Sequence, residues 1–548
     1  MPGTRADLVL LGQVVLQATR DGVQTADAIG IADGRVVSAG TRDEVLGVAA
    51  RGARRLDLGG SAIVPGIHDF HLHLVGMARA RRDLVLDEAP SFAAIRDAIA
   101  LRATGLQAGE WLRGRGWHES VFEAGPTTDL ASAVGDAPAF LYSHDGHSAW
   151  ASPAGLALAG LGDESEDPAG GRLERDPAGR LTGVLRERAT DLVEPVCGRL
   201  GGDRLRDALD ETLAALSGLG ITAATDAGDS AAIDGVGAYA ALGDRASQVL
   251  ANHDLVDGRL RLALNVPSDA VAAAAGLGLR TGVRIGSNHT LRGGWVKVYL
   301  DGALGSRTAA CFDAFTCGRP GNRGILRMQA DDLTALLDES SRAGLRVAMH
   351  AIGDRALALA LEALERVPER VPASATGPAH RLEHLQLVRR ADLPRLVGLG
   401  LTASLQPIHV AADREPAERC WADRMADVYA TRAIAASGAR LAFGSDAPIE
   451  SVNPWHGIFA AVHRRFPADG TPDWRPDQAI GAPAALAAYT SGPAAGLGAI
   501  DEGHLHPGAR ADLAVLDIDL PTLLAGDEAM ATARSLLTLV DGREVHRA

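Results

Sequence analysis

Two histidines that could hold a metal ion, His71 and His73, lie in the stretch Val64-Pro-Gly-Ile-His-Asp-Phe-His-Leu-His-Leu-Val75. The apolar run 62–64 that leads into this stretch predicts a buried strand, with both histidines at its end. Side chains at positions i and i+2 project from the same face of a strand, so both imidazoles can reach one metal ion. The pair alone is weak evidence, because many buried histidines only hydrogen-bond to a carbonyl group.

Further metal-ligand side chains recur where other strands are expected to end. A neutral imidazole is a good zinc ligand, and a carboxylate is an oxygen donor that can also accept a proton. A lysine ammonium repels a cation, so a lysine can serve only when it is deprotonated or converted into an anion. The candidate ligands are His71, His73, Lys297, His350, His384 and Asp446. Six such side chains at strand ends favour a metal centre over structural accident.

Strands and helices alternate through the middle of the chain. After the first strand, further strands are expected at 220–226, 260–266, 295–301, 346–352, 381–386, 402–406 and 440–446. Helical patterns separate several of them, at 204–219, 331–343, 355–367 and 484–497. Eight strands with intervening helices predict an α/β fold, a closed parallel (β/α)8 TIM-like barrel. The chemistry of such a barrel lies at the C-terminal ends of its strands.

The period of two along a strand predicts which way the candidate side chains point. Lys297 and Asp301 share one face of their strand, and Asp301 could fix the orientation of a metal ligand. In the strand at 381–386, Glu383 is expected to point away from the face that carries His384.

The two ends of the chain differ from the middle. Short strands split by turn signals fill residues 5–60, and strands of the same kind recur near the C-terminus. We therefore expect residues 1–61 and 500–548 to build one composite β-sandwich. The barrel domain is expected to span residues 62–499.

A long interval at residues 77–204 interrupts the alternation between the first strand and the second. Insertions of this length after a barrel strand tend to cover or line the mouth of the barrel. The interval holds Trp111, Trp117 and Trp150, three of the seven tryptophans, together with His147. We interpret it as a lid or substrate-pocket subdomain in which Trp117 is a candidate substrate contact. A surface insertion without a role is the alternative.

Composition narrows the classes of protein. A hydrophobic fraction of 47% with 22% charged residues is normal for a soluble globular enzyme. The net charge of −15 argues against a nucleic-acid partner, which would normally meet a basic face. The N-terminus lacks a signal-peptide pattern, and no apolar run approaches the ~18 residues of a membrane span. We expect a cytoplasmic protein that interacts with neither nucleic acid nor membrane.

Cysteine usage also favours the cytoplasm. The four cysteines, Cys197, Cys311, Cys317 and Cys420, are too few in so long a chain for a disulfide framework. We therefore expect them to be reduced. Cys311 and Cys317 share a Gly/Pro-rich stretch, where a metal or redox role is the less favoured alternative.

Motifs along nearly the whole chain resemble those of one family. They lie at residues 65–73, 145–150, 296–309, 350–356, 381–384, 404–407, 444–448 and 508–515. The chain resembles the amidohydrolase superfamily, and within it the YtcJ-like or amidohydrolase-3 branch that includes N-substituted formamide deformylases. Ile67-His68 stands where this branch usually has phenylalanine and isoleucine before the aspartate. His68 is therefore an extra histidine that is not expected to be a ligand.

The resemblance implies a role for each candidate ligand. It implies two metal positions, one held by His71 and His73 and the other by His350 and His384, bridged by a carboxylated Lys297. Asp446 would bind the attacking water and act first as general base and then as general acid. Zinc is the favoured divalent metal, although His-rich sites also accept Mn, Fe or Co. One ion or two both remain open.

Residues outside this set are candidates for substrate contacts. His147, in Asp-Gly-His-Ser, could orient the substrate or stabilise a developing oxyanion, with a structural hydrogen bond as an equal alternative. Ser306 and Arg307, after the fourth strand, could contact a polar or anionic group of the substrate, with a role at a helix start or on the surface as an equal alternative. Trp455 could wall the pocket or pack within a helix. Gln406 and His409 follow the seventh strand and could reach the mouth of the barrel, but a turn or core role is favoured for them. His118, His144 and His289 are among the residues expected to be ordinary histidines.

We therefore predict metal-dependent hydrolysis of a carbon–nitrogen bond in a small, linear amide such as an N-substituted formamide, by metal-activated water. Hydrolysis of a cyclic amide, a carbamate or an amine is the alternative within the same class. A metal-binding regulatory protein without turnover is the alternative of another class. The resemblance further implies a homodimer.

Overall fold

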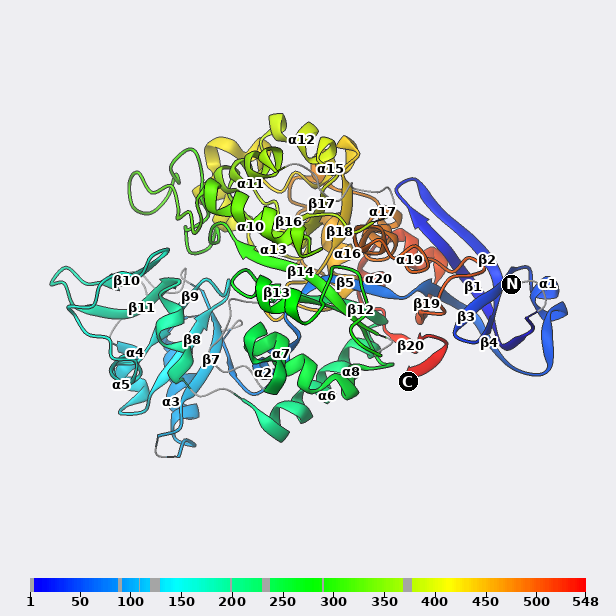
Figure 1. The fold of residues 1–548 in the computed structure, drawn as a ribbon, viewed down its shortest axis with the longest axis horizontal. Coiled ribbons are helices and arrows are strands. Elements are labelled where there is room, and N and C mark those ends of the chain that lie inside the picture. Colours follow the sequence, from blue (N-terminus) through cyan, green and yellow to red (C-terminus); the bar gives the residue numbers. More distant parts are fainter. Residues whose placement is uncertain are drawn as a thin grey trace.

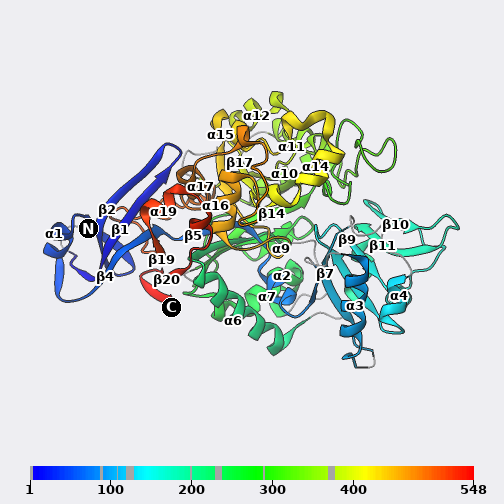
Figure 2. The same ribbon diagram turned by 180° about the vertical axis from the view of Figure 1, so that it is seen from behind.

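The computed structural model describes residues 4–86, 91–107, 109–118, 129–197, 200–228, 237–287, 290–367 and 377–548. His289 lies outside these residues. The described chain forms three β-sheets with helices around them. The parallel barrel lies in the centre, with the sheet of the two termini at one end and the sheet of the insertion at the other (Figures 1 and 2).

Eight parallel strands form the predicted barrel. They are β5 (Ile67–Leu72), β12 (Ile221–Asp226), β13 (Arg261–Pro267), β14 (Leu291–Tyr299), β15 (Val347–Ala351), β16 (Arg381–His384), β17 (Thr402–Leu405) and β18 (Arg440–Phe443). Two backbone hydrogen bonds join the ends of β5 and β18. Asp446 N donates to His71 O at 2.7 Å, and His73 N donates to Ala447 O at 2.8 Å. The predicted fold class is confirmed.

Helices with one apolar face cover the outside of the barrel. In α6 (Gly202–Gly218) the buried leucines Leu205, Leu209, Leu213 and Leu216 recur at helical spacing, so one face of this helix packs inward. The helices α10 (Ala330–Arg342) and α11 (Asp354–Arg366) cover the neighbouring strands in the same way. The barrel strands are buried on both faces, as parallel strands flanked by helices must be.

The two ends of the chain build one seven-stranded sheet in the order β21-β20-β19-β4-β1-β2-β3. Its strands are β1 (Ala6–Thr19), β2 (Gly22–Ala32), β3 (Arg35–Gly40), β4 (Ala49–Pro65), β19 (Leu513–Asp519), β20 (Ser535–Val540) and β21 (Arg543–Arg547). The antiparallel pair of β4 and β19 joins the N-terminal strands to the C-terminal ones. β4 continues to Pro65, so the apolar run 62–64 belongs to this sheet and not to the first barrel strand. Apolar residues continue from the end of β4 into β5. The sequence pattern therefore did not show where the chain leaves one sheet and enters the other.

The insertion forms a six-stranded sheet of its own, in the order β10-β11-β9-β8-β7-β6. Its strands are β6 (Leu84–Val85), β7 (Leu112–Trp117), β8 (Ala139–Ser143), β9 (Ser148–Ala151), β10 (Gly171–Arg175) and β11 (Leu181–Glu187). The helix α3 (Phe92–Ala103) packs on this sheet through Ile95 and Ile99, which belong to a separate hydrophobic core. The insertion is therefore a packed subdomain rather than a long loop.

The expectation that all four cysteines are reduced is wrong for one pair. Cys317 and Cys420 form a disulfide across a sequence separation of 103, whereas Cys197 and Cys311 are buried free thiols. Cys317 follows β14, and Cys420 ends α14 (Arg414–Cys420), which follows β17. The fold brings these two distant segments together, and cysteine spacing along the chain could not show it.

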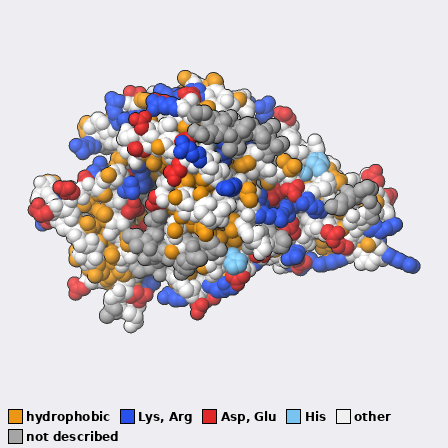
Figure 3. Space-filling view, in the orientation of Figure 1, with side chains coloured by type: hydrophobic (Ala, Val, Ile, Leu, Met, Phe, Trp, Pro, Cys, Tyr) orange, Lys and Arg blue, Asp and Glu red, His pale blue; other side chains and the backbone are white. Residues whose placement is uncertain are grey.

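The surface and the helices bear on possible partners. Across the described residues, every helix falls short of the length and apolar character that a membrane crossing requires. On the face seen in Figure 3, acidic and basic side chains are scattered among hydrophobic and uncharged ones.

Closure of the barrel depends on a glycine, and this can be tested. A Cβ at Gly444 would lie 2.4 Å from the backbone nitrogen of His71 and 2.8 Å from its Cβ. We expect Gly444→Ala to lower the free energy of unfolding by about 1–3 kcal/mol, because backbone would have to move. Gly47→Ala, where a Cβ meets nothing within 4 Å, is the control, with a change below about 0.5 kcal/mol. Urea unfolding followed by tryptophan fluorescence measures both, and equal unfolding midpoints would contradict the expectation.

Candidate functional site

A cavity of about 200 Å³ lies at the C-terminal ends of the barrel strands, between the barrel and the insertion. The barrel contributes all six predicted ligands, His71, His73, Lys297, His350, His384 and Asp446. The insertion contributes residues that include Tyr142, His144, Asp145, His147 and Glu187. The structure thus brings the six candidates together in one place, while their role as metal ligands stays a prediction.

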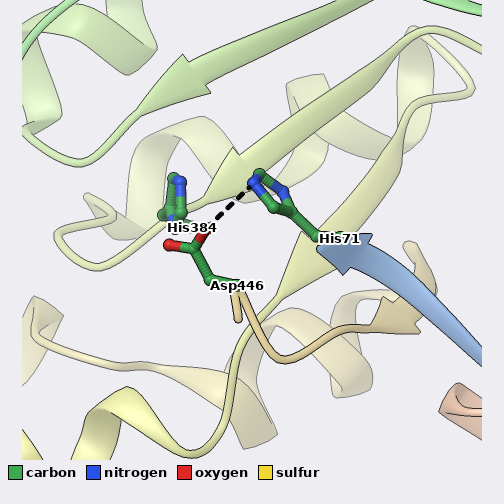
Figure 4. Close-up of side chains that lie close together, drawn as sticks. All are labelled: His71, His384 and Asp446. Carbon is green, nitrogen blue, oxygen red and sulfur yellow. Dashed lines mark ion pairs between the residues drawn. The ribbon is translucent and has the colours of Figure 1, made fainter. Parts of the chain in front are cut away.

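Three of the candidates converge most closely. Ligand atoms of His71, His384 and Asp446 all lie within 4.8 Å of one another, and the three residues are buried. Oδ1 of Asp446 lies 3.3 Å from Nε2 of His71 and 3.1 Å from Nε2 of His73. In Figure 4, His71 extends from the end of a barrel strand toward the carboxylate of Asp446, which comes from the segment after β18. This arrangement could hold one cation.

A buried carboxylate orients His71. Oε2 of Glu383 accepts a hydrogen bond from Nδ1 of His71 at 2.7 Å, and Oε1 pairs with Nε of Arg381 at 2.5 Å. Burial raises the pKa of Glu383, but the opposite effect of Arg381 and His71 is larger. The pKa of this carboxyl group therefore lies well below its ordinary value. Glu383 is therefore an anion that holds the proton of His71 on Nδ1. Nε2 then faces the cavity and Oδ1 of Asp446, as the ligating nitrogen of a metal-bound histidine would.

The placement of Glu383 corrects the expectation that it points away from the site. His384 has a φ of 74° and Leu385 a φ of 50°, so the backbone enters the left-handed region at the end of β16. This conformation breaks the alternation of faces that holds within a regular strand. Both Glu383 and His384 can therefore lie beside His71.

His350 is oriented in the same way as His71. Its Nδ1 lies 3.1 Å from Oδ1 of Asp301, whose carboxylate also accepts backbone N–H groups from Ala310, Ile352 and Gly353. Burial raises the pKa of Asp301 to about 7 against the opposing effect of these N–H donors, so a nearby cation would stabilise its anionic form. Asp301 thus contacts a candidate ligand, in agreement with the expectation from sequence.

Within the described part of the chain, two buried nitrogens of the cluster find no hydrogen-bond partner. They are Nε2 of His350 and Nδ1 of His384. Burial lowers the pKa of both histidines well below the ordinary value, so both are neutral and each carries a lone pair. Unpartnered buried polar atoms are rare in proteins, and neutral imidazoles beside a carboxylate are the donors that zinc prefers. These residues fit a divalent metal ion.

Lys297 is buried next to the same cluster. Its Nζ lies 3.5 Å from Nε2 of His71 and 4.7 Å from the ring centroid of Tyr299. The side chain therefore points into the cavity, as the period of β14 predicts. Its carboxylation stays a prediction from the family resemblance.

The sequence favoured a turn or core role for His409 over a position at the mouth of the barrel, and the structure places it beside Asp446. This residue begins α13 (His409–Ala412), and its Nε2 lies 3.2 Å from Oδ2 of Asp446. The two oxygens of Asp446 are thus engaged on different sides, Oδ1 by His71 and His73 and Oδ2 by His409. The signal in the sequence is that His409 lies two residues after the family-like motif at 404–407. A turn or core role was favoured because the residue lies beyond the strand.

The insertion places His147 beside the barrel histidines. The imidazole centroids of His147 and His350 are 5.1 Å apart. Nδ1 of His147 lies 3.0 Å from Oε2 of Glu187, which also pairs with Nη1 of Arg327 at 3.3 Å. Burial lowers the pKa of His147, but Glu187 and Asp145 together raise it above its ordinary value, which shifts the ring toward its charged form. His147 can therefore donate hydrogen bonds in the cavity.

His144 is not the ordinary histidine that was expected. It lines the same cavity, and its Nε2 lies 2.9 Å from Oε1 of Glu450. Its ring stacks on that of His118, with centroids 4.2 Å apart. His144 follows β8 in a turn of the insertion, and the sequence offered no period by which to orient it.

The four other predicted substrate contacts lie outside the set of described residues that line the cavity. Trp117 is buried in the core of the insertion, where its Nε1 donates to Leu141 O at 2.8 Å. Trp455 is fully buried in α16 (Pro454–His463), packed within the main barrel core. Ser306 is buried and hydrogen-bonds to Thr308, and Arg307 also lies away from the cavity lining. Both indoles pack into apolar cores, which neither the place of Trp117 in the insertion nor that of Trp455 shortly after Asp446 could predict.

A closed barrel whose strand ends bring neutral imidazoles and a carboxylate into one polar cavity defines a metal-dependent hydrolase. The model of the amidohydrolase family matches residues 54–546. The chain therefore belongs to the amidohydrolase family, and it is a hydrolase acting on carbon–nitrogen bonds other than peptide bonds. The predicted resemblance is confirmed.

Similar proteins support this assignment. The chain is 29% identical to the putative amidohydrolase YtcJ of Bacillus subtilis, over 85% of each chain. It is 28% identical to the N-substituted formamide deformylase of Arthrobacter pascens, over 94% of each chain. An uncharacterized metal-dependent hydrolase from Pyrococcus horikoshii has a similar crystal structure, with 26% identity and a TM-score of 0.73. That match covers 95% of this chain and 99% of the other.

The role of Glu383 in orienting His71 yields a testable prediction. Glu383→Gln keeps the shape of the side chain but removes the charge that holds the proton on Nδ1 of His71. We expect the affinity for Zn²⁺ to fall by about 10–100-fold, measured by competition with a chelating dye. Glu418→Gln, which alters a half-exposed side chain paired with Arg414, is the control and should leave the affinity unchanged. Unchanged affinity in a folded Glu383→Gln protein would show that this contact does not orient a ligand.

Proposed function

We propose that this protein hydrolyses the carbon–nitrogen bond of a small linear amide, with N-substituted formamides as the favoured class. The observation that carries the proposal is the convergence of His71, His384 and Asp446 at the floor of a cavity of about 200 Å³. A cavity of this size suits a small substrate. The likeness to the N-substituted formamide deformylase of Arthrobacter pascens favours a formamide over other amides.

A divalent metal ion, zinc by preference, would be held by His71, His384 and Asp446. The neighbouring candidates are His73, Lys297 and His350, and a carboxylated Lys297 would bridge a second ion. When bound, the metal would polarise the substrate carbonyl and make water acidic enough to attack at neutral pH. Every other part of the reaction falls to side chains of the protein.

Asp446 would carry the proton. Burial raises the pKa of this carboxylate, but His71 and hydrogen bonds from the surrounding histidines hold it well below the ordinary value. Asp446 is therefore an anion at neutral pH that can accept a proton from the attacking water. It can then pass that proton to the leaving nitrogen. His409 would keep the carboxylate in place by its contact with Oδ2.

His147 would act on the substrate from the side of the insertion. Its pairing with Glu187 fixes the ring and favours the charged form, in which both ring nitrogens donate. Such a donor could orient the substrate carbonyl and stabilise the oxygen as negative charge develops on it. Barrel residues would thus perform the proton transfer while the insertion positions the substrate.

Removal of the carboxylate of Asp446 tests the proposed function. We expect Asp446→Asn to reduce kcat/KM by about 10²–10⁴-fold, because the proton shuttle is lost. The assay measures amine release from N-substituted formamides of graded size, from a cyclic amide and from a carbamate, with Zn²⁺-loaded, Mn²⁺-loaded and metal-free protein. Asp473→Asn, which alters a half-exposed carboxylate, is the matched control and should retain full activity.

Two results would decide against the proposal. If both Asp446→Asn and His71→Ala kept near-parental turnover, the proposed active site would be wrong. Metal retention without turnover on any of the substrates would favour the alternative of a metal-binding regulatory protein. Faster turnover of the cyclic amide or the carbamate would show that the substrate is of that class, while the proposed hydrolysis of a carbon–nitrogen bond would stand.

A further inference from the structure

The imidazole of His73 is held differently from those of His71 and His350. In the latter two, Nδ1 faces the buried carboxyl group of Glu383 or Asp301, so Nδ1 carries a proton and Nε2 faces the cavity. In His73, Nδ1 instead lies 2.9 Å from Nη1 of Arg245. One candidate ligand thus faces a guanidinium where the other two face carboxyl groups.

The contact with Arg245 fixes the tautomer of His73. A guanidinium has only donors and does not lose its proton in proteins, so Nδ1 of His73 is the acceptor. A neutral imidazole that accepts at Nδ1 carries its proton on Nε2. Nε2 lies 3.1 Å from Oδ1 of Asp446, to which it can donate. Hydrogen bonds therefore run from Arg245 through His73 to Asp446, and they need no cation.

The helices around Arg245 leave room for this contact. Arg245 belongs to α7 (Asp244–Ala251), and Gly76 lies opposite it in α2 (Leu74–Ala80). A Cβ at Gly76 would come within 3.1 Å of Cβ of His73 and 3.5 Å of Nη1 of Arg245. A larger side chain would occupy the path of the guanidinium. Glycine at this position therefore permits the contact.

We propose that Arg245 controls whether His73 can bind a metal ion. This inference rests on the proposed metal-dependent function and concerns how the centre is filled. A cation bound to Nε2 of His73 requires the proton to leave Nε2 and return to the ring at Nδ1. Two N–H donors would then face each other, so Arg245 must move away. Metal binding that uses only His71, His384 and Asp446 does not require this movement.

Metal titration of the whole protein tests the inference. Metal-free protein is titrated with Zn²⁺ in competition with a chelating dye, and the number of bound ions is measured by atomic emission. Arg245→Met keeps the length of the side chain but removes its donors. We expect the binding step that uses His73 to tighten by about ten-fold, a typical effect of a residue that orients a ligand. Arg245→Gln, which is too short to reach His73, should tighten the same step.

Two comparisons separate this effect from the loss of a positive charge. Arg79→Met removes another guanidinium from the cavity lining and should tighten binding by much less. In a His73→Ala background, Arg245→Met should have no effect. Unchanged affinity in both Arg245 variants, equal tightening by Arg79→Met, or an undiminished effect without His73 would each overturn the inference. Metal-free protein that binds no divalent ion would overturn the proposed function as well, whereas a metal-dependent hydrolase indifferent to Arg245 would overturn the inference alone.

Discussion

The hydrogen bonds between the end of β5 and the segment after β18 are the constraint on which the candidate site depends. They join Asp446 N to His71 O and His73 N to Ala447 O. As a result, the Asp446 carboxylate meets the imidazole of His73, from which it is 373 positions distant in the chain. Gly444 permits the approach because any Cβ there would strike the backbone of His71. The contacts that close the barrel therefore also bring the candidate site residues together.

A buried ion pair between Arg381 and Glu383 supports the site from inside the barrel. The guanidinium of Arg381 lies 4.5 Å from the ring centroid of Phe70 and 4.4 Å from that of Trp295. It also pairs with Glu383, so neither of these buried charges lacks a partner. The other carboxylate oxygen of Glu383 is then available to His71. Aromatic rings thus fix an arginine, the arginine fixes a carboxylate, and the carboxylate fixes the histidine.

The sequence predicted the barrel and its six converging side chains because both follow from periodicity. Apolar strands of period two alternate with helical patterns, and chemistry in such a barrel lies at strand ends. Lys297 could be oriented in this way because β14 pairs with β15 without a register shift from Val296 to Tyr299. Glu383 could not, since the left-handed backbone at His384 ends the alternation.

Side chains placed by packing or by loops could not be oriented from the sequence. His409 and His144 lie just beyond strands, where the period of two no longer applies. Each nevertheless contacts a carboxylate, His409 that of Asp446 and His144 that of Glu450. Trp117 lies in the insertion and Trp455 shortly after Asp446, but their large apolar surfaces pack into cores. The disulfide of Cys317 and Cys420 likewise depends on segments that only the fold brings together.

Two parts of the chain, the barrel and the insertion, line the cavity. The barrel supplies the six candidate ligands, whereas the insertion supplies His147, Tyr142 and His144. Glu187 joins the two parts, because it accepts from His147 within the insertion and from Thr308 and Arg327 in the segment after β14. Arg115 and His144 of the insertion also contact the segment after Asp446, through Pro448 O and Glu450. The insertion therefore contacts both the segment after β14 and the segment that carries Asp446.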